Sequence, residues 1–107
     1  MDVGPLQARI LHLLWKDGTH SVQAIMNALN ATPGQRPLAY TTYLTVCRNL
    51  ARRNFVKQAQ GPGRAHLFTA AVAKEDYLRK VAKETLTTWF NGNLDAFVLI
   101  AKDAMGP

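Results

Sequence analysis

The sequence predicts a mainly α fold with one small β-hairpin, followed by a short helical region at the C-terminal end. Apolar residues recur at helical spacing in five segments, and two short β-prone segments flank a turn at residues 61–64. The chain has 107 residues, of which 48% are hydrophobic. That is enough for one domain with a modest core and a short extension.

The first two helices are predicted from the spacing of apolar residues. A helix over residues 5–16 starts with Pro5, which suits the first turn, and its apolar face is Leu6, Ile10, Leu13 and Leu14. After a short polar connection, Ser21 can cap a second helix over residues 22–30, whose apolar face is Val22, Ile25, Met26 and Leu29. The following segment, 31–37, is rich in helix breakers and longer than a usual helix-turn-helix connection.

A third helix is predicted over residues 40–53, and Asn54, which tolerates left-handed geometry, is expected to end it. This helix has two contrasting faces. Its apolar face is Tyr43, Val46, Cys47 and Leu50, and its polar face is Thr41, Thr42, Thr45, Arg48, Asn49 and Arg52. Threonine is a mediocre helix former, so helix propensity does not explain three threonines on one exposed face. A DNA groove does explain them, because threonine can contact thymine methyls and arginine can bind guanine with two hydrogen bonds.

A β-hairpin is predicted next, with strands over residues 55–60 and 65–70 and a turn over residues 61–64. Arg64 falls at the tip, where it can reach a phosphate or the minor groove. A hairpin alone could be an ordinary surface feature. After three helices at this spacing, it instead predicts a winged helix-turn-helix.

The C-terminal region is predicted to be helical over residues 74–90 and again from Leu94. One side of the first helix carries Leu78, Val81, Ala82, Thr85 and Trp89, and the second repeats Leu94, Phe97, Val98 and Ala101. So wide an apolar surface either folds back on the winged domain or pairs with a second chain, and we favour pairing. We therefore expect a DNA-binding domain over residues 1–73 and a short helical dimerisation region over 74–107.

Charge is distributed unevenly along the chain. The net charge is +6, and residues 18–74 contain seven Lys or Arg residues and no Asp or Glu. A stretch of one sign beside a near-neutral tail indicates that one part of the protein meets a polyanion.

Catalytic and metal-binding chemistry is not expected. Cys47 has no cysteine partner, and His12, His20 and His66 fall on different predicted elements, so we expect no metal site and no cofactor. No catalytic motif is present, and we expect no enzyme. Because no signal peptide or membrane span is recognisable, we expect a cytoplasmic protein.

Three segments resemble the penicillinase-repressor family of winged-helix transcriptional regulators, the BlaI/MecI type. They are GPLQARILHLLW at residues 4–15, LAYTTYLTVCRNLARR at 38–53, and AKEDYL at 73–78, and the likeness spans about residues 4–90. The resemblance implies a homodimeric repressor that binds an inverted-repeat operator and is released by proteolysis or another inducing signal. The paired cysteines of the copper-responsive relatives are absent, and the dimerisation region is expected to lack the family's final helix.

The resemblance also implies site residues. Thr41, Thr42, Thr45 and Arg48 would read bases, with Tyr40 and Asn49 in the same interface, and Arg52, Lys57 and Arg64 would hold phosphates. The dimerisation residues would be Leu78, Trp89, Leu94, Phe97, Val98 and Ala101. The alternatives are a winged-helix module that binds an acidic protein partner, and a sensor repressor with a small ligand in the C-terminal region. The threonine–arginine stripe argues against the first of these, and the C-terminal region offers no polar cluster for the second.

Overall fold

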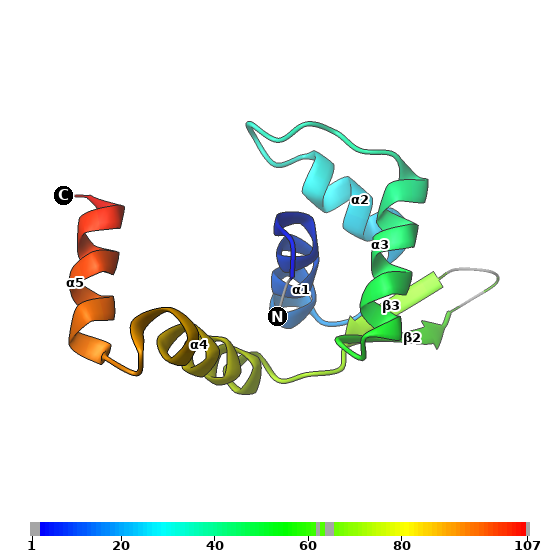
Figure 1. Ribbon diagram of the computed structural model, residues 1–107. Coiled ribbons are helices and arrows are strands. Elements are labelled where there is room, and N and C mark those ends of the chain that lie inside the picture. Colours follow the sequence, from blue (N-terminus) through cyan, green and yellow to red (C-terminus); the bar gives the residue numbers. More distant parts are fainter. Residues whose placement is uncertain (1–2, 62, 64–65, 107) are drawn as a thin grey trace. The chain divides into compact units, whose positions relative to one another are not determined.

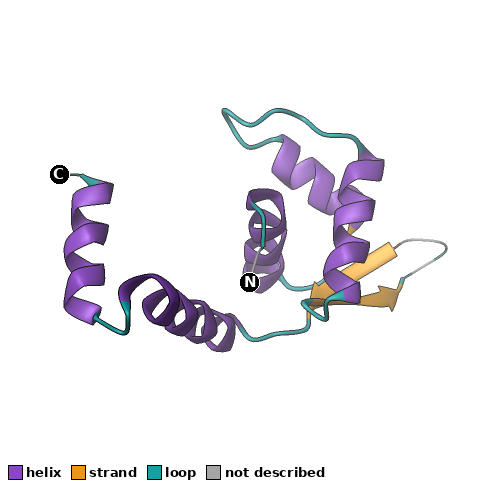
Figure 2. Ribbon diagram, viewed as in Figure 1, coloured by secondary structure: helices purple, strands orange, loops and turns teal. Residues whose placement is uncertain are grey.

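The computed structural model describes residues 3–61, 63 and 66–106 (Figure 1). The chain forms two compact units, Met1–Ala73 and Lys74–Pro107. The first unit contains three helices and a small sheet, and the second contains two helices (Figure 2). In the described part of the chain, no helix is both long enough and apolar enough to cross a membrane.

The first unit has the predicted order of three helices followed by a hairpin. Its elements are α1 (Pro5–Asp17), β1 (His20–Ser21), α2 (Val22–Asn30), α3 (Tyr40–Arg52), β2 (Val56–Gln60) and β3 (His66–Ala70). The three strands form one antiparallel sheet in the order β1-β3-β2. The predicted winged helix-turn-helix is confirmed, with helix boundaries within one residue of the expected ones.

Strand β1 is the element that the sequence did not predict. His20 pairs with Phe68 and Ser21 pairs with Leu67, so the expected polar connection between α1 and α2 is the third strand of the sheet. Two residues are too short to show the alternation that identifies a strand. His20 and Ser21 form a strand only because they pair with β3.

The core of the first unit is formed by all three helices and two of the strands. Tyr43 and Phe68 are its largest fully buried side chains. The other buried residues are Ile10, Leu11, Leu14, Val22, Ile25, Leu29, Cys47, Leu50 and Val56. Leu11 is buried although it lies outside the predicted apolar face of α1, whereas the predicted Leu6 and Leu13 are half-buried.

Local contacts define the ends of the helices. The Ser21 hydroxyl accepts a hydrogen bond from the Ala24 backbone N–H at 3.0 Å, which confirms the predicted cap of α2. Arg9 donates to the Leu29 carbonyl at 3.0 Å and satisfies an acceptor in the last turn of α2. Asn54 adopts φ 64°, the left-handed geometry expected for the residue that ends the third helix.

The second unit is a pair of helices, α4 (Lys74–Phe90) and α5 (Leu94–Met105). The turn between them uses positive φ at Asn91 and Gly92, and the Asn93 side chain caps α5 by accepting from the Ala96 N–H at 3.0 Å. Helix α5 continues past its apolar repeat to Met105. No residue of either helix is fully buried, so this unit has no core of its own.

Candidate nucleic-acid interface

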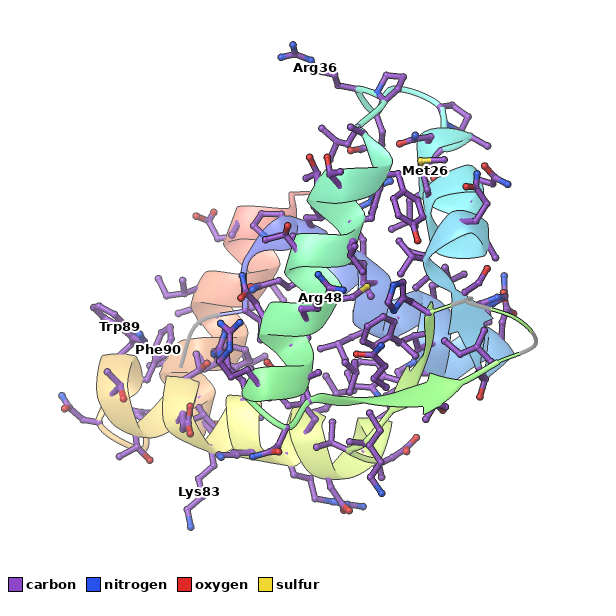
Figure 3. All side chains as sticks on the ribbon, turned by 90° about the vertical axis from the view of Figure 1, so that its right-hand side faces the viewer. Met26, Arg36, Arg48, Lys83, Trp89 and Phe90 are labelled. Carbon is purple, nitrogen blue, oxygen red and sulfur yellow. The ribbon has the colours of Figure 1, made fainter. Side chains whose placement is uncertain are left out.

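Helix α3 presents one buried face and one exposed face. Tyr43, Cys47 and Leu50 have 0% exposure and attach the helix to the core. The exposed side chains are Thr41, Thr42, Thr45, Arg48 and Arg52. Figure 3 shows Arg48 midway along this helix. The four positions 41, 45, 48 and 52 thus form a continuous polar stripe that contributes nothing to the core.

Two other predicted residues of α3 are less accessible than the stripe. Tyr40 is half-buried and packs against the core. Asn49 is half-buried, and its side-chain oxygen accepts a hydrogen bond from Arg52 Nη1 at 2.9 Å. Asn49 therefore orients the Arg52 guanidinium along the helix and still leaves donors of Arg52 available for a phosphate.

The hairpin places a second basic group after α3. Lys57 is exposed on β2 opposite Thr69. Across the strands, the Gln58 amide nitrogen and His66 Nδ1 are 2.9 Å apart. Arg64, the predicted contact at the tip, lies outside the described residues.

Uncompensated positive charge surrounds this surface. Arg36, Arg48, Arg52 and Lys57 are all exposed, and none forms a salt bridge with a described residue. Residues 18–74 contain no carboxylate side chain that could neutralise them locally. Such a positive field attracts a polyanion, and the binding free energy between the protein and the polyanion depends on salt concentration.

The connection between α2 and α3 is held in place by one side chain, Asn30. Its amide nitrogen donates to the Leu38 carbonyl at 2.9 Å, and its amide oxygen accepts from the Leu38 N–H at 3.0 Å. The same oxygen accepts from the Tyr43 hydroxyl at 2.6 Å. Asn30 thus joins the end of α2, the end of the connection and the first turns of α3.

Arg36 is a basic residue of this surface that sequence reasoning did not assign to the site. It lies in the exposed connection shortly before α3 (Figure 3). Residues 31–37 have neither helical nor strand periodicity, so the sequence pattern does not predict which of their side chains are exposed. The signal available was the isolation of this arginine within a segment otherwise without Lys or Arg.

Cys47 and the histidines do not form a metal site. Burial raises the pKa of the Cys47 thiol to about 11, so it remains a neutral, small apolar group. Among the described residues, no three His, Cys, Asp or Glu side chains gather closely enough to hold a metal ion.

The predicted dimerisation residues differ in exposure. Trp89 is 78% exposed, and Leu78, Leu94 and Val98 are also exposed. Phe97 and Ala101 are half-buried, and the Phe97 ring meets the Phe90 ring edge-on at 5.3 Å between centroids, which joins α5 to α4. Three further apolar residues of α5 are also exposed: Leu99, Ile100 and Met105.

Comparison with known proteins supports the fold and the type of protein. The family described as penicillinase repressor matches residues 3–104, beyond the 4–90 covered by the predicted resemblance. A comparison with curated proteins gives no match.

Solved structures give the same fold. The complex of hsRosR-S1 aligns with 97% of this chain and 94% of its own, with a TM-score of 0.65 and 18% identity. The structure of H. salinarum RosR grown from NaBr aligns with 97% of this chain and 96% of its own, with a TM-score of 0.63 and 18% identity. The structure of YusO from Bacillus subtilis aligns with 98% of this chain and 77% of its own, with a TM-score of 0.57 and 16% identity.

Proposed function

The chain belongs to the penicillinase repressor family of DNA-binding transcription regulators, and from this premise we propose that it is a repressor that binds an inverted-repeat operator as a homodimer. Helix α3 enters the major groove and the hairpin contacts the adjacent backbone. A bound dimer excludes RNA polymerase from the promoter by occupying the same DNA.

The observation that carries the proposal is the exposed face of α3. Its accessible side chains are three threonines and two arginines, while Tyr43, Cys47 and Leu50 on the opposite face are fully buried and Val46 is half-buried. Protein interfaces favour aromatic anchors at their centre, and this face has none. Hydroxyls, methyl groups and guanidinium groups are instead the chemistry that reads base edges.

The residues of the interface divide into two roles. Thr41, Thr42, Thr45 and Arg48 read bases, because their side chains are exposed on the outward face of the first two and a half turns of α3. Arg52 holds a phosphate near the C-terminal end of α3 and Lys57 holds one from β2, and the same role is proposed for Arg64 from its place in the sequence between the two strands. Tyr40 and Asn49 support the contacts from their half-buried positions.

The second unit provides the dimer contact. It has no buried residue of its own and exposes large apolar side chains, a state that costs free energy in water. A second copy of the chain would cover Leu78, Trp89, Leu94, Phe97, Val98 and Ala101. The two-fold axis of that dimer then matches the two-fold symmetry of the operator.

Release from DNA and location in the cell complete the proposal. An inducing signal ends repression. Proteolysis is one form that such a signal takes in this family. The protein acts in the cytoplasm, where its operator DNA is.

The test is selection of duplexes from a random pool at near-physiological salt, followed by sequencing of the retained fraction. The proposal requires enrichment of a palindrome and a steep loss of affinity as salt rises. Retention without enrichment would mean non-specific electrostatic binding. Absence of retention would favour a winged-helix module that binds an acidic protein.

A further inference from the structure

We propose that Arg36, held on the connection between α2 and α3, binds a DNA backbone phosphate beside the N-terminal end of α3. This inference rests on the proposed function, since it adds a contact to the same complex. It makes the connection a part of the interface rather than a passive link.

The connection is ordered by its own contacts. The Gln35 N–H donates to the Thr32 carbonyl at 3.3 Å, and Gly34, the third residue of that turn, has φ 78°. With Pro33 at its second position, this is the pattern of a type II turn. Arg36 follows the turn at once and precedes Leu38, which the Asn30 side chain holds through both its N–H and its carbonyl.

The backbone of Arg36 is further restricted by Pro37. A residue before proline favours extended backbone conformations, so the direction of the Arg36 Cα–Cβ bond is restricted before any ligand binds. The side chain itself is exposed and makes no hydrogen bond or ion pair with another described residue. The Arg36 side chain therefore makes no polar contact with a described residue that stabilises the fold, and its N–H donors remain available to a phosphate.

The distribution of charge shows what Arg36 supplies. It is the only Lys or Arg between Lys16 and Arg48. The exposed residues in the first half of α3 are neutral threonines, and the described basic groups of the helix and hairpin begin at Arg48. Among the described residues of the connection and of α3, Arg36 is therefore the only cation on the N-terminal side of Arg48.

The dimensions of the helix favour two opposite contacts. From Tyr40 to Arg52, α3 rises by roughly 18 Å at 1.5 Å per residue. The major groove of DNA is about 12 Å wide, so a helix of this length that crosses it brings its two ends to the two phosphate walls. Arg36 would contact one wall, while Arg52 and Lys57 contact the other.

The test compares Arg36→Gln with Lys83→Gln, which removes one charge from an exposed position on α4. Affinities for the duplex recovered from the pool and for a scrambled duplex are measured between 0.1 and 0.3 M salt. Loss of one phosphate contact per subunit lowers the slope of log K against log salt by about 0.9 per subunit. At 0.15 M salt the affinity falls roughly five-fold per subunit on both duplexes. Lys83→Gln leaves slope and affinity unchanged, and Arg36→Lys retains most of the slope.

The contact is located by replacing single phosphates with uncharged methylphosphonates. One substitution per half-site, at the groove wall beside the N-terminal end of α3, should weaken the wild-type protein and leave Arg36→Gln unaffected. A slope for Arg36→Gln equal to that of the wild type would overturn the contact alone. Loss on the recovered duplex but not on the scrambled one would assign Arg36 to base reading and overturn the phosphate contact. Failure of the wild-type protein to bind either duplex would overturn the proposed function as well.

Discussion

Replacing Asn30 by alanine should destabilise the first unit and weaken DNA binding through the same contacts. The substitution removes three hydrogen bonds, two to the Leu38 backbone and one to the Tyr43 hydroxyl. The connection before α3 then loses the side chain that closes it onto the helix. We expect the fold to persist, because Asn30 is not part of the apolar core.

The magnitude follows from the surroundings of each partner. The two Leu38 groups are part-buried beside an exposed connection, so water can replace Asn30 and each bond contributes about 1 kcal/mol. The Tyr43 side chain is fully buried, and its stranded hydroxyl costs about 1–3 kcal/mol. The total is about 3–5 kcal/mol of unfolding free energy.

The assay is chemical denaturation of the full chain at one fixed protein concentration, since association would otherwise shift the midpoint. Asn27→Ala is the matched control, because Asn27 lies on the exposed side of α2 and its side chain bonds only Gln23 among the described residues. We expect the control to change stability by less than about 0.5 kcal/mol.

A double-mutant cycle isolates the tyrosine contact. Tyr43→Phe alone should cost about 1 kcal/mol, whereas in the Asn30→Ala background it should be neutral or stabilising, because it removes the stranded hydroxyl. If Asn30→Ala destabilises no more than Asn27→Ala, or if the two substitutions are additive, Asn30 does not hold the connection and our reasoning is wrong.

Three further predictions concern the proposed interface, the dimer and the core. Arg48→Ala should weaken binding to the recovered duplex by about 1–3 kcal/mol, and Thr45→Ala should reduce base preference at one position; unchanged enrichment from a random pool would refute both roles. Trp89→Glu should convert the dimer to a monomer in sedimentation analysis without loss of helical signal, and an unchanged mass would remove Trp89 from the dimer contact. Cys47 should resist alkylation at pH 8 in the folded protein, because burial raises its pKa to about 11 and leaves almost no thiolate at pH 8, whereas in urea it should react readily.

Much of the fold could be predicted because its signals are local. The apolar spacing of α2 and α4 defined both helices to the residue, and Ser21 and Asn54 marked helix ends through their own backbone and side-chain chemistry. The polar stripe of α3 was readable for the same reason. Once a helix has one apolar face, the opposite face is exposed, and Thr41, Thr45, Arg48 and Arg52 are all exposed in the structure.

Residues far apart in sequence were harder to predict. The Trp15 indole N–H donates to the Val72 carbonyl at 2.9 Å, across 57 positions of the chain. The apolar spacing of the first helix by itself identifies no partner for this indole. Leu11 was missed for a related reason, since the neighbours of α1 determine how much of its circumference is covered.

By itself, the sequence determined the helices, the hairpin and the concentration of positive charge in residues 18–74, because periodicity, turn chemistry and charge act within one segment. Only the tertiary structure decided that His20 and Ser21 form a strand and that Asn30 closes the connection before α3. Arg36 likewise acquired a defined place only when that connection was anchored. The physical reason is that a short strand and a lone amide have no preferred partner until packing of the core brings Phe68, Leu38 and Tyr43 within hydrogen-bonding distance.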